Sequence, residues 1–150
     1  MEWLVNAKEM KQCDTNTSDY FGISSDVLME RASDAFCQCM KDELSTAKHI
    51  LVLCGTGNNG GDGLCIARTL YLQGKSVNVY FPLGFPKKDS LCGKKLAILQ
   101  KYGLSPIPHL PDLERVDVII DAVFGTGLSR DLPEELQEQF ALCAKSTAKK

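Results

Sequence analysis

The segment Leu51–Leu64 reads LVLCGTGNNGGDGL and constrains the fold more than any other part of the chain. A short apolar run ends in Cys54, five glycines follow within nine residues, and a stretch with helical spacing comes directly afterwards. This order predicts a strand, a tight loop and a helix. Glycines allow positive φ angles and close approach of a ligand, and the loop amides with the helix N-terminus favour an anion such as a phosphate. Asn58, Asn59 and Asp62 add side-chain oxygens, which hard cations prefer.

Strand and helix patterns alternate along the rest of the chain, after two N-terminal helices. We expect helices at Asn6–Tyr20, Ser25 to about Leu44, Asp62–Gln73, Ser90–Tyr102 and Pro133 to about Cys143, strands at His49–Cys54, Ser76–Phe81 and Val116–Ala122, a short strand at most at Leu104–Ile107, and a frayed tail at Ser146–Lys150. Repeated strand–helix units predict an α/β fold with a parallel sheet and helices on both faces.

The first strand of such a sheet is central, and a ligand binds where the strand order reverses. If Val116–Ala122 is the neighbour of the first strand, the loops Gly55–Gly63 and Phe124–Asp131 face each other at the C-terminal strand ends. Asp121, at the end of its strand, would then point into the same crevice.

Length and charge exclude several classes of function. The 150 residues suffice for one domain with a real core. With 17 basic and 19 acidic residues and no basic tract longer than a pair, we expect no nucleic acid and no membrane surface as partners. No apolar run has the length of a bilayer span, and the N-terminus lacks the features of a signal peptide, so we expect a cytoplasmic protein.

The seven cysteines point to packing rather than to a metal or a disulfide framework. Their number is odd, none forms a C-x-x-C pair, and His49 and His109 lie far from any pair of cysteines in the sequence. We therefore expect reduced cysteines that act mostly as small core residues.

The glycine block matches one common nucleotide motif only in part. Gly55-x-Gly57-x-x-Gly60 satisfies the dinucleotide fingerprint, but the end of the second strand, Val79–Pro82, has no acid for a ribose. This disfavours a nicotinamide dehydrogenase and a methyltransferase, and the lack of Gly-Lys-Ser/Thr after the glycines excludes a P-loop. Two amides, a carboxylate and three glycines within Asn58–Gly63 are denser than a turn requires, which favours a functional site over a structural turn.

Three segments together resemble the NAD(P)H-hydrate epimerase family, the YjeF-type N-terminal domain. They are GNNGGDGL with Ala67-Arg68 after it, DVIIDAVFGTGL at Asp117–Leu128, and the helix segment Val27–Ala32. The resemblance spans roughly Val5 to Leu142, and the first two segments are the specific ones. Ser33 stands where the family often has glycine.

The resemblance implies a Rossmann-like, three-layer αβα fold with a mostly parallel sheet and the N-terminal helices packed on it. It implies an isomerase that interconverts the R and S hydrates of NADH and NADPH, so that an S-specific NAD(P)H-hydrate dehydratase repairs both. By position, the residues that resemble substrate-binding residues are Asn58, Asn59, Gly60, Gly61 and Asp62 and the second loop of Gly125, Thr126, Gly127, Leu128, Ser129, Arg130 and Asp131. Asn59 and Asp121 resemble ligands of K⁺, and Asp62 is the candidate catalytic group, with capping of the following helix as its alternative role.

The family domain normally continues into a further strand with an Asp-x-Pro-Ser-Gly type motif, which this sequence lacks. We therefore expect 1–150 to be a single incomplete epimerase-like domain, either a fragment of a longer reading frame or a chain that associates, for example as a homodimer, through the edge of Val116–Ala122. The alternative to an epimerase is a non-catalytic nucleotide-binding or interaction module of the same fold. Glu30 and Arg31 either reach the site or lie on a solvated turn.

Overall fold

Three parallel strands form the sheet in the computed structural model, which describes residues 4–126, 128 and 131–150. The strand order is β2-β1-β3, with β1 at His49–Cys54, β2 at Ser76–Tyr80 and β3 at Val118–Ala122. In the central strand, Leu51 is paired with Asn78 on one side and Ile119 on the other. The predicted α/β fold, with its parallel sheet and central first strand, is confirmed.

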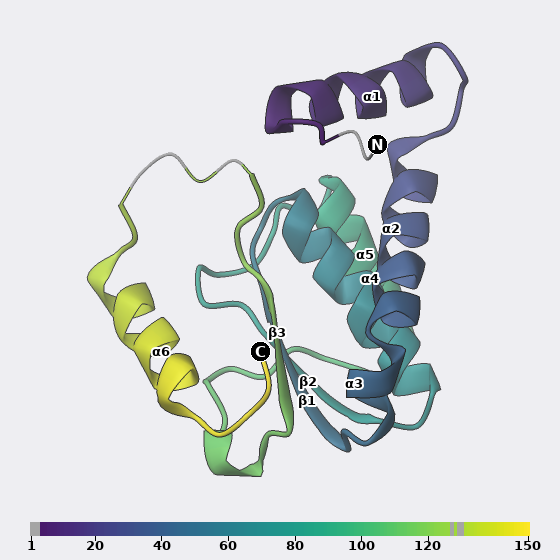
Figure 1. Ribbon diagram of the computed structural model, residues 1–150. Helices are drawn as coiled ribbons and strands as arrows, with labels where there is room; N and C mark the ends of the chain where they lie inside the picture. The colour runs from purple at the N-terminus through teal and green to yellow at the C-terminus, as the bar shows by residue number, and fades with distance from the viewer. Residues whose placement is uncertain (1–3, 127, 129–130) are drawn as a thin grey trace.

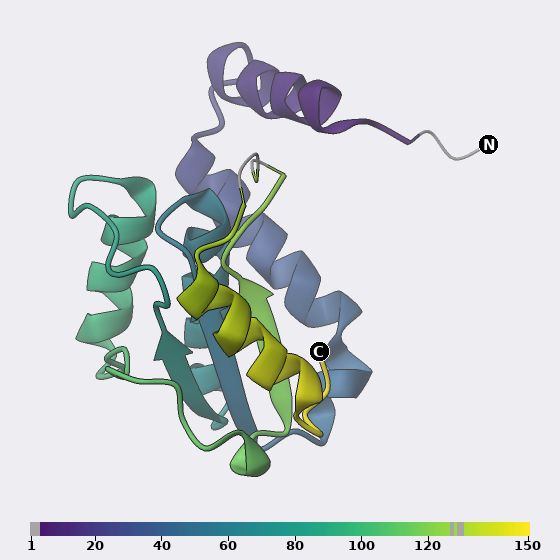
Figure 2. The ribbon, with the colours of Figure 1, turned by 90° about the vertical axis from the view of Figure 1, so that its left-hand side faces the viewer.

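Helices cover both faces of the sheet, which gives three layers (Figure 1). The helix α4, Asn58–Leu72, packs on one face with α5, Leu91–Lys101, beside it. The helix α6, Glu134–Lys145, lies across the other face (Figure 2). Each face has its own apolar core, built around Ile50 and Val52 under α4 and around Leu51 and Leu53 under α6.

The N-terminal helices lie outside α4. The predicted helix from Ser25 to Leu44 is two helices, α2 at Ser25–Cys39 and the short α3 at Lys41–Ser45, and α2 packs against α4. The first helix, α1 at Ala7–Asp19, is closed at its start by an Asn6–Glu9 capping box but buries none of its side chains. It lies at the end of the molecule toward which the strands point (Figure 2).

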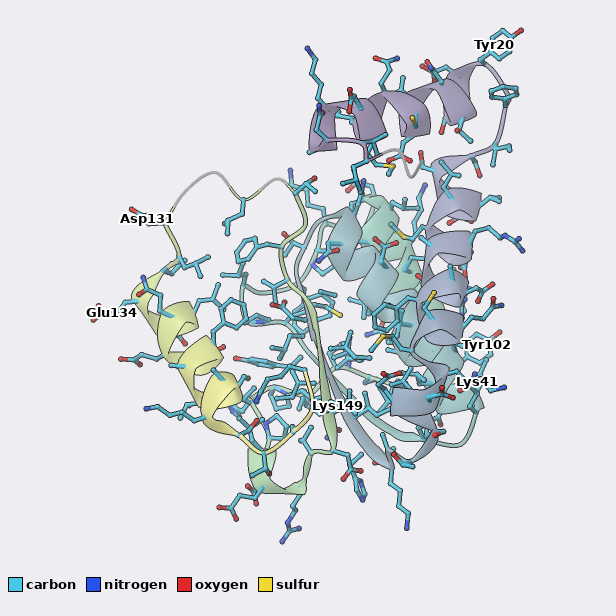
Figure 3. All side chains as sticks on the ribbon, viewed as in Figure 1. Tyr20, Lys41, Tyr102, Asp131, Glu134 and Lys149 are labelled. Atoms are coloured by element: carbon cyan, nitrogen blue, oxygen red, sulfur yellow. The ribbon has the colours of Figure 1, made fainter. Side chains whose placement is uncertain are left out.

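The tail Ser146–Lys150 is ordered against the sheet, so its prediction as a frayed end is wrong. The Lys149 amide donates to the Asp117 carbonyl at 2.9 Å, and the Lys149 carbonyl accepts from the Ile119 amide at 2.8 Å. This parallel bridge covers the start of the β3 edge, which the sequence predicts to be exposed, and Ala148 is buried beside it. Figure 3 shows Lys149 beside β3.

The remaining features are short. Leu104–Ile107 contributes a single parallel bridge, Tyr80 to Ile107, and one turn of 3-10 helix, η1 at Leu113–Arg115, precedes β3. All seven cysteines are free and four of them are buried, in keeping with a packing role. Within the described residues, no helix combines the length and the apolar character needed to cross a membrane.

Candidate functional site

The glycine block is helical earlier than the sequence predicts. The helix α4 begins at Asn58 rather than Asp62, with Gly57 as its N-cap, and the first intrahelical bond runs from the Gly61 amide to the Gly57 carbonyl at 3.1 Å. The amides of Asn58, Asn59 and Gly60 therefore have no acceptor among the described residues, as is usual for the first turn of a helix. Free amides at a helix N-terminus favour the binding of an anion.

Close packing, not positive φ, explains most of these glycines. None of the five glycines of the block has a positive φ, so that expectation is wrong. A Cβ on Gly55 would lie 2.0 Å from the Val123 carbonyl oxygen, one on Gly60 would lie 1.8 Å from the Gly55 carbonyl oxygen, and one on Gly63 would lie 2.6 Å from Cβ of Ala122. A Cβ on Gly57 would meet nothing within 4 Å, which leaves its surface open to a ligand.

The two glycine-bearing loops meet, as the sequence predicts. The Asn59 side-chain amide donates to the Phe124 carbonyl at 2.9 Å, and the Gly55 amide donates to the Ala122 carbonyl at 3.0 Å. A Cβ on Gly125 would lie 3.5 Å from Cβ of Asn59. The N-terminus of α4 and the loop after β3 are therefore in direct contact at the C-terminal ends of two neighbouring strands.

Asn59 and Asp121 both retain oxygens that could face a cation. Because the Asn59 amide nitrogen donates to Phe124, its Oδ1 is left as an acceptor. One carboxylate oxygen of Asp121 accepts from the Val123 amide at 3.0 Å, and the side chain is exposed at the end of β3. An amide oxygen and a carboxylate oxygen suit a hard cation.

The second loop is described only in part. Gly125, Thr126, Leu128 and Asp131 are exposed, whereas the predicted substrate contacts Gly127, Ser129 and Arg130 lie outside the described residues. Figure 3 shows Asp131 close to the start of α6, on the outer side of the molecule.

Asp62 lies in the second turn of α4, so its alternative role as the cap of this helix is wrong. Burial raises the pKa of its carboxyl group from 3.8 to about 6; the Asp14 carboxylate adds to the rise and Lys95 opposes it. The side chain faces a cavity of about 210 Å³. The residues lining this cavity come from four helices or their first turns: Asp14, Ser25, Leu28, Met29, Ala32, Asn58, Asp62 and Leu91.

An ion-pair network beside this cavity fixes α2 against α4 and α5. Glu30 binds both Arg68 and Lys95, and Lys95 also pairs with Asp26 at 2.8 Å. The Lys95 side chain is only 1% exposed. Hydrogen bonds from Arg68, helped by Lys95, lower the pKa of Glu30 from 4.5 to about 2 despite its partial burial.

The structure gives Glu30 neither of the two roles predicted for it, whereas the exposure of Arg31 fits a solvated position. Glu30 belongs to an interhelical contact, and Arg31 is exposed. Ser33, where the family often has glycine, is buried and its hydroxyl lies 2.9 Å from the Met29 carbonyl oxygen and 3.1 Å from that of Asp62. The added hydroxyl therefore has acceptors on both α2 and α4.

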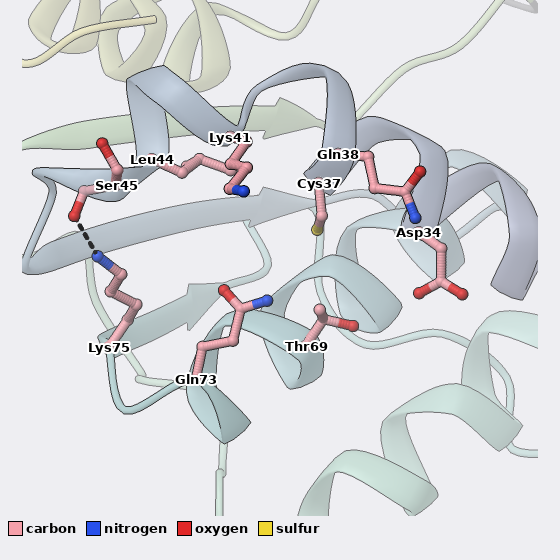
Figure 4. Close-up of a pocket in the computed structure, with 9 residues that line it drawn as sticks. All are labelled: Asp34, Cys37, Gln38, Lys41, Leu44, Ser45, Thr69, Gln73 and Lys75. Atoms are coloured by element: carbon pink, nitrogen blue, oxygen red, sulfur yellow. Dashed lines mark hydrogen bonds between the residues drawn. The ribbon is translucent and has the colours of Figure 1, made fainter.

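A second cavity, of about 410 Å³, lies at the opposite end of α4 (Figure 4). It is lined by Thr69 and Gln73 of α4 and by residues of α2 and α3. Lys75 also lines this cavity, and its amine already donates to the carbonyl oxygens of Ser45 and Ala47, at 2.9 and 2.7 Å. Since ligands of parallel sheets bind at the C-terminal strand ends, Asn58–Asp62 is the better candidate site than this cavity.

Comparisons with known proteins find similarity along most of the chain. The family model described as YjeF-related protein N-terminus matches residues 25–150. A Leuconostoc gelidum subsp. gasicomitatum protein named NAD(P)H-hydrate epimerase is 42% identical over 135 residues, which cover 90% of this chain and 60% of that protein. A protein of the same name from Oenococcus oeni is 40% identical over 134 residues, covering 88% of this chain and 63% of that protein.

A solved structure shows the same fold. The crystal structure of yeast ynu0, YNL200c, superimposes with a TM-score of 0.73 and 27% sequence identity, covering 95% of this chain and 65% of the yeast chain. The chain spans about three fifths of the length of the curated relatives that it matches. By its sequence segments, its fold and these similarities, the chain belongs to the family of YjeF-related protein N-terminal domains.

Proposed function

We propose that this chain interconverts the R and S hydrates of NADH and NADPH. The observation that carries the proposal is the contact of Asn59 with the loop after β3, which joins the two specific family segments into one site. The relatives named NAD(P)H-hydrate epimerase support the reaction.

The start of α4 supplies the binding site for the diphosphate of the substrate. The amides of Asn58, Asn59 and Gly60, which have no acceptor in the part of the chain that the structure describes, offer hydrogen-bond donors at a helix N-terminus. The open surface of Gly57 admits the ligand. The described start of the loop after β3, at Phe124 and Gly125, lies against Asn59 and would contribute the opposite wall.

Asp62 serves as the group that moves a proton. With a pKa of about 6, its carboxyl group exchanges protons readily near neutral pH. The protonated carboxyl group gives its proton to the ring hydroxyl, which leaves as water, and the carboxylate stabilises the cationic ring. Water then adds to the other face of the ring and returns a proton to the carboxylate, so the cycle has no net change except in configuration.

A potassium ion fits the oxygens at the meeting point of the two loops. Asn59 and Asp121 would hold it, because each has an oxygen that is not used by another group of the described site. Held there by Asn59 and Asp121, the ion would supply positive charge near the diphosphate and join the two loops.

A non-catalytic nucleotide-binding module is the second candidate. In this case the amides at the start of α4 bind a nucleotide without turnover.

A coupled assay separates the two candidates. Purified R-hydrate is incubated with an S-specific dehydratase, and recovery of NADH is followed with and without this chain. Acceleration supports the epimerase, whereas binding of the hydrate without acceleration supports the module. If the chain neither binds the hydrate nor accelerates the recovery of NADH, both candidate functions are contradicted.

A further inference from the structure

One wall of the cavity beside Asp62 comes from α1, which lies outside the sequence segments that mark the site. Asp14, on α1, lines it together with Ser25 and Leu28 of α2, Asn58 and Asp62 of α4 and Leu91 of α5. The helix α1 buries no side chain, so the hydrophobic effect does not explain its position over the N-terminus of α4.

The two carboxylates of the cavity are free to meet a ligand. Among the hydrogen bonds and ion pairs of the described residues, none involves the side chain of Asp14 or Asp62. The nearby cation of α5, Lys95, is already engaged by Asp26 and Glu30. Since no ion pair of the described residues joins either carboxylate to a cation, both carboxylates offer acceptors, which repel phosphate and favour an uncharged group with N–H or O–H donors.

The size of the cavity restricts the occupant to one ring. Sites for whole drug-sized ligands measure roughly 300–1,000 Å³, whereas this cavity measures about 210 Å³. The lining also includes the polar residues Ser25 and Asn58, and its apolar part, from Leu28, Met29 and Leu91, suits the faces of a flat heterocycle. Met29 is held in place because it packs directly against Gly61 of α4.

We propose that the hydrated nicotinamide ring binds in this cavity and that α1 completes it, with Asp14 accepting a hydrogen bond from the hydroxyl or carboxamide of the ring. This inference rests on the proposed function, since Asp62, the group that moves the proton, lines the same cavity and must reach the ring. The adenine ring has similar size and donors, and the test distinguishes the two.

The test compares two ligands by isothermal titration calorimetry: hydrated NADH, and ADP-ribose, which lacks the nicotinamide. Asp14→Ala removes the acceptor and improves helix propensity, so the variant keeps its fold, which circular dichroism verifies. Asp19→Ala, at the last position of the same helix and outside the cavity, is the matched control. We expect Asp14→Ala to weaken binding of the hydrate about tenfold, the loss typical of a hydrogen bond to a charged group, and to leave ADP-ribose unchanged.

Three results overturn the inference. Equal binding of the hydrate by Asp14→Ala and the unchanged chain shows that Asp14 does not contact the ring. An equal loss for ADP-ribose assigns the cavity to adenine or to the common part of the ligands. If the unchanged chain binds neither ligand, the proposed function fails as well, and this outcome is distinct from the first two.

Discussion

Replacing Glu30 with glutamine removes the carboxylate that joins three helices. Glu30 of α2 binds Arg68 of α4 and Lys95 of α5, and these helices form the walls of the Asp62 cavity. Glutamine keeps the size of the side chain but leaves Arg68 without its counter-charge and Lys95 with only Asp26. The variant therefore tests whether this ion-pair network contributes to the stability of the three packed helices.

The magnitude follows from the pKa of Glu30. The fall from 4.5 to about 2 corresponds to about 3 kcal/mol of preference for the ionised form. Because the Glu30 side chain is 31% exposed, solvent screening reduces this to about 2 kcal/mol. A carboxyl group whose pKa is lowered by folding stabilises the protein above its unfolded pKa of 4.5 and loses that effect as the pH falls toward 2.

Urea unfolding between pH 7 and pH 3 measures the effect. We expect Glu30→Gln to lower the free energy of unfolding by about 2 kcal/mol at pH 7, and the difference from the unchanged chain to shrink by more than half at pH 3. Asp34→Asn, an exposed change on the same helix, is the control and should show neither effect. A loss for Glu30→Gln that is the same at both pH values would refute the ion-pair argument.

Three further predictions concern the site itself. Gly60→Ala should lower the unfolding free energy by about 2 kcal/mol or more, because its Cβ would collide with the Gly55 carbonyl oxygen, whereas Gly57→Ala should fold normally in urea titrations but bind ADP-ribose more weakly. Asp62→Asn should raise stability at pH 7 by about 1 kcal/mol and have little effect at pH 3.5, because the raised pKa makes the ionised form costly as the pH rises from 3.8 through about 6; a pH-independent change would contradict this. Asp121→Ala should remove the difference in epimerase activity between K⁺ and Na⁺ buffers. If the unchanged chain has equal activity in both buffers, the proposed potassium site is contradicted.

The layered fold follows from the sequence because its signals are local. The apolar runs at β1 and β3 and the alternation of strands with helices specify a parallel sheet with little ambiguity. The sequence does not indicate the start of α4 at Asn58, because the four glycines and two asparagines of Gly57–Gly63 have low helix propensity. Packing against Val123 and Ala122, which the glycines permit, overrides that propensity.

Other features depend on contacts that no local pattern encodes. Nothing in the first helix marks Asp14 as different from Asp19, because only the fold brings Asp14 to the cavity beside Asp62. Nothing in the sequence distinguishes Lys95 from a solvent-exposed lysine. In the structure it is buried, and its ion pairs with Asp26 and Glu30 offset the cost of burying its charge. The tail at Lys149 contains no strand pattern and is ordered by pairing with β3.

Separation of the R and S hydrates by chromatography tests the central claim most directly. Pure R-hydrate is incubated in potassium buffer with the chain, and the appearance of the S form is compared with the spontaneous rate in the same buffer. Our account predicts a faster approach to the equilibrium mixture, in proportion to the amount of chain, and a loss of this effect on Asp62→Asn. An R-to-S rate that equals the spontaneous one at every concentration of folded chain would contradict it.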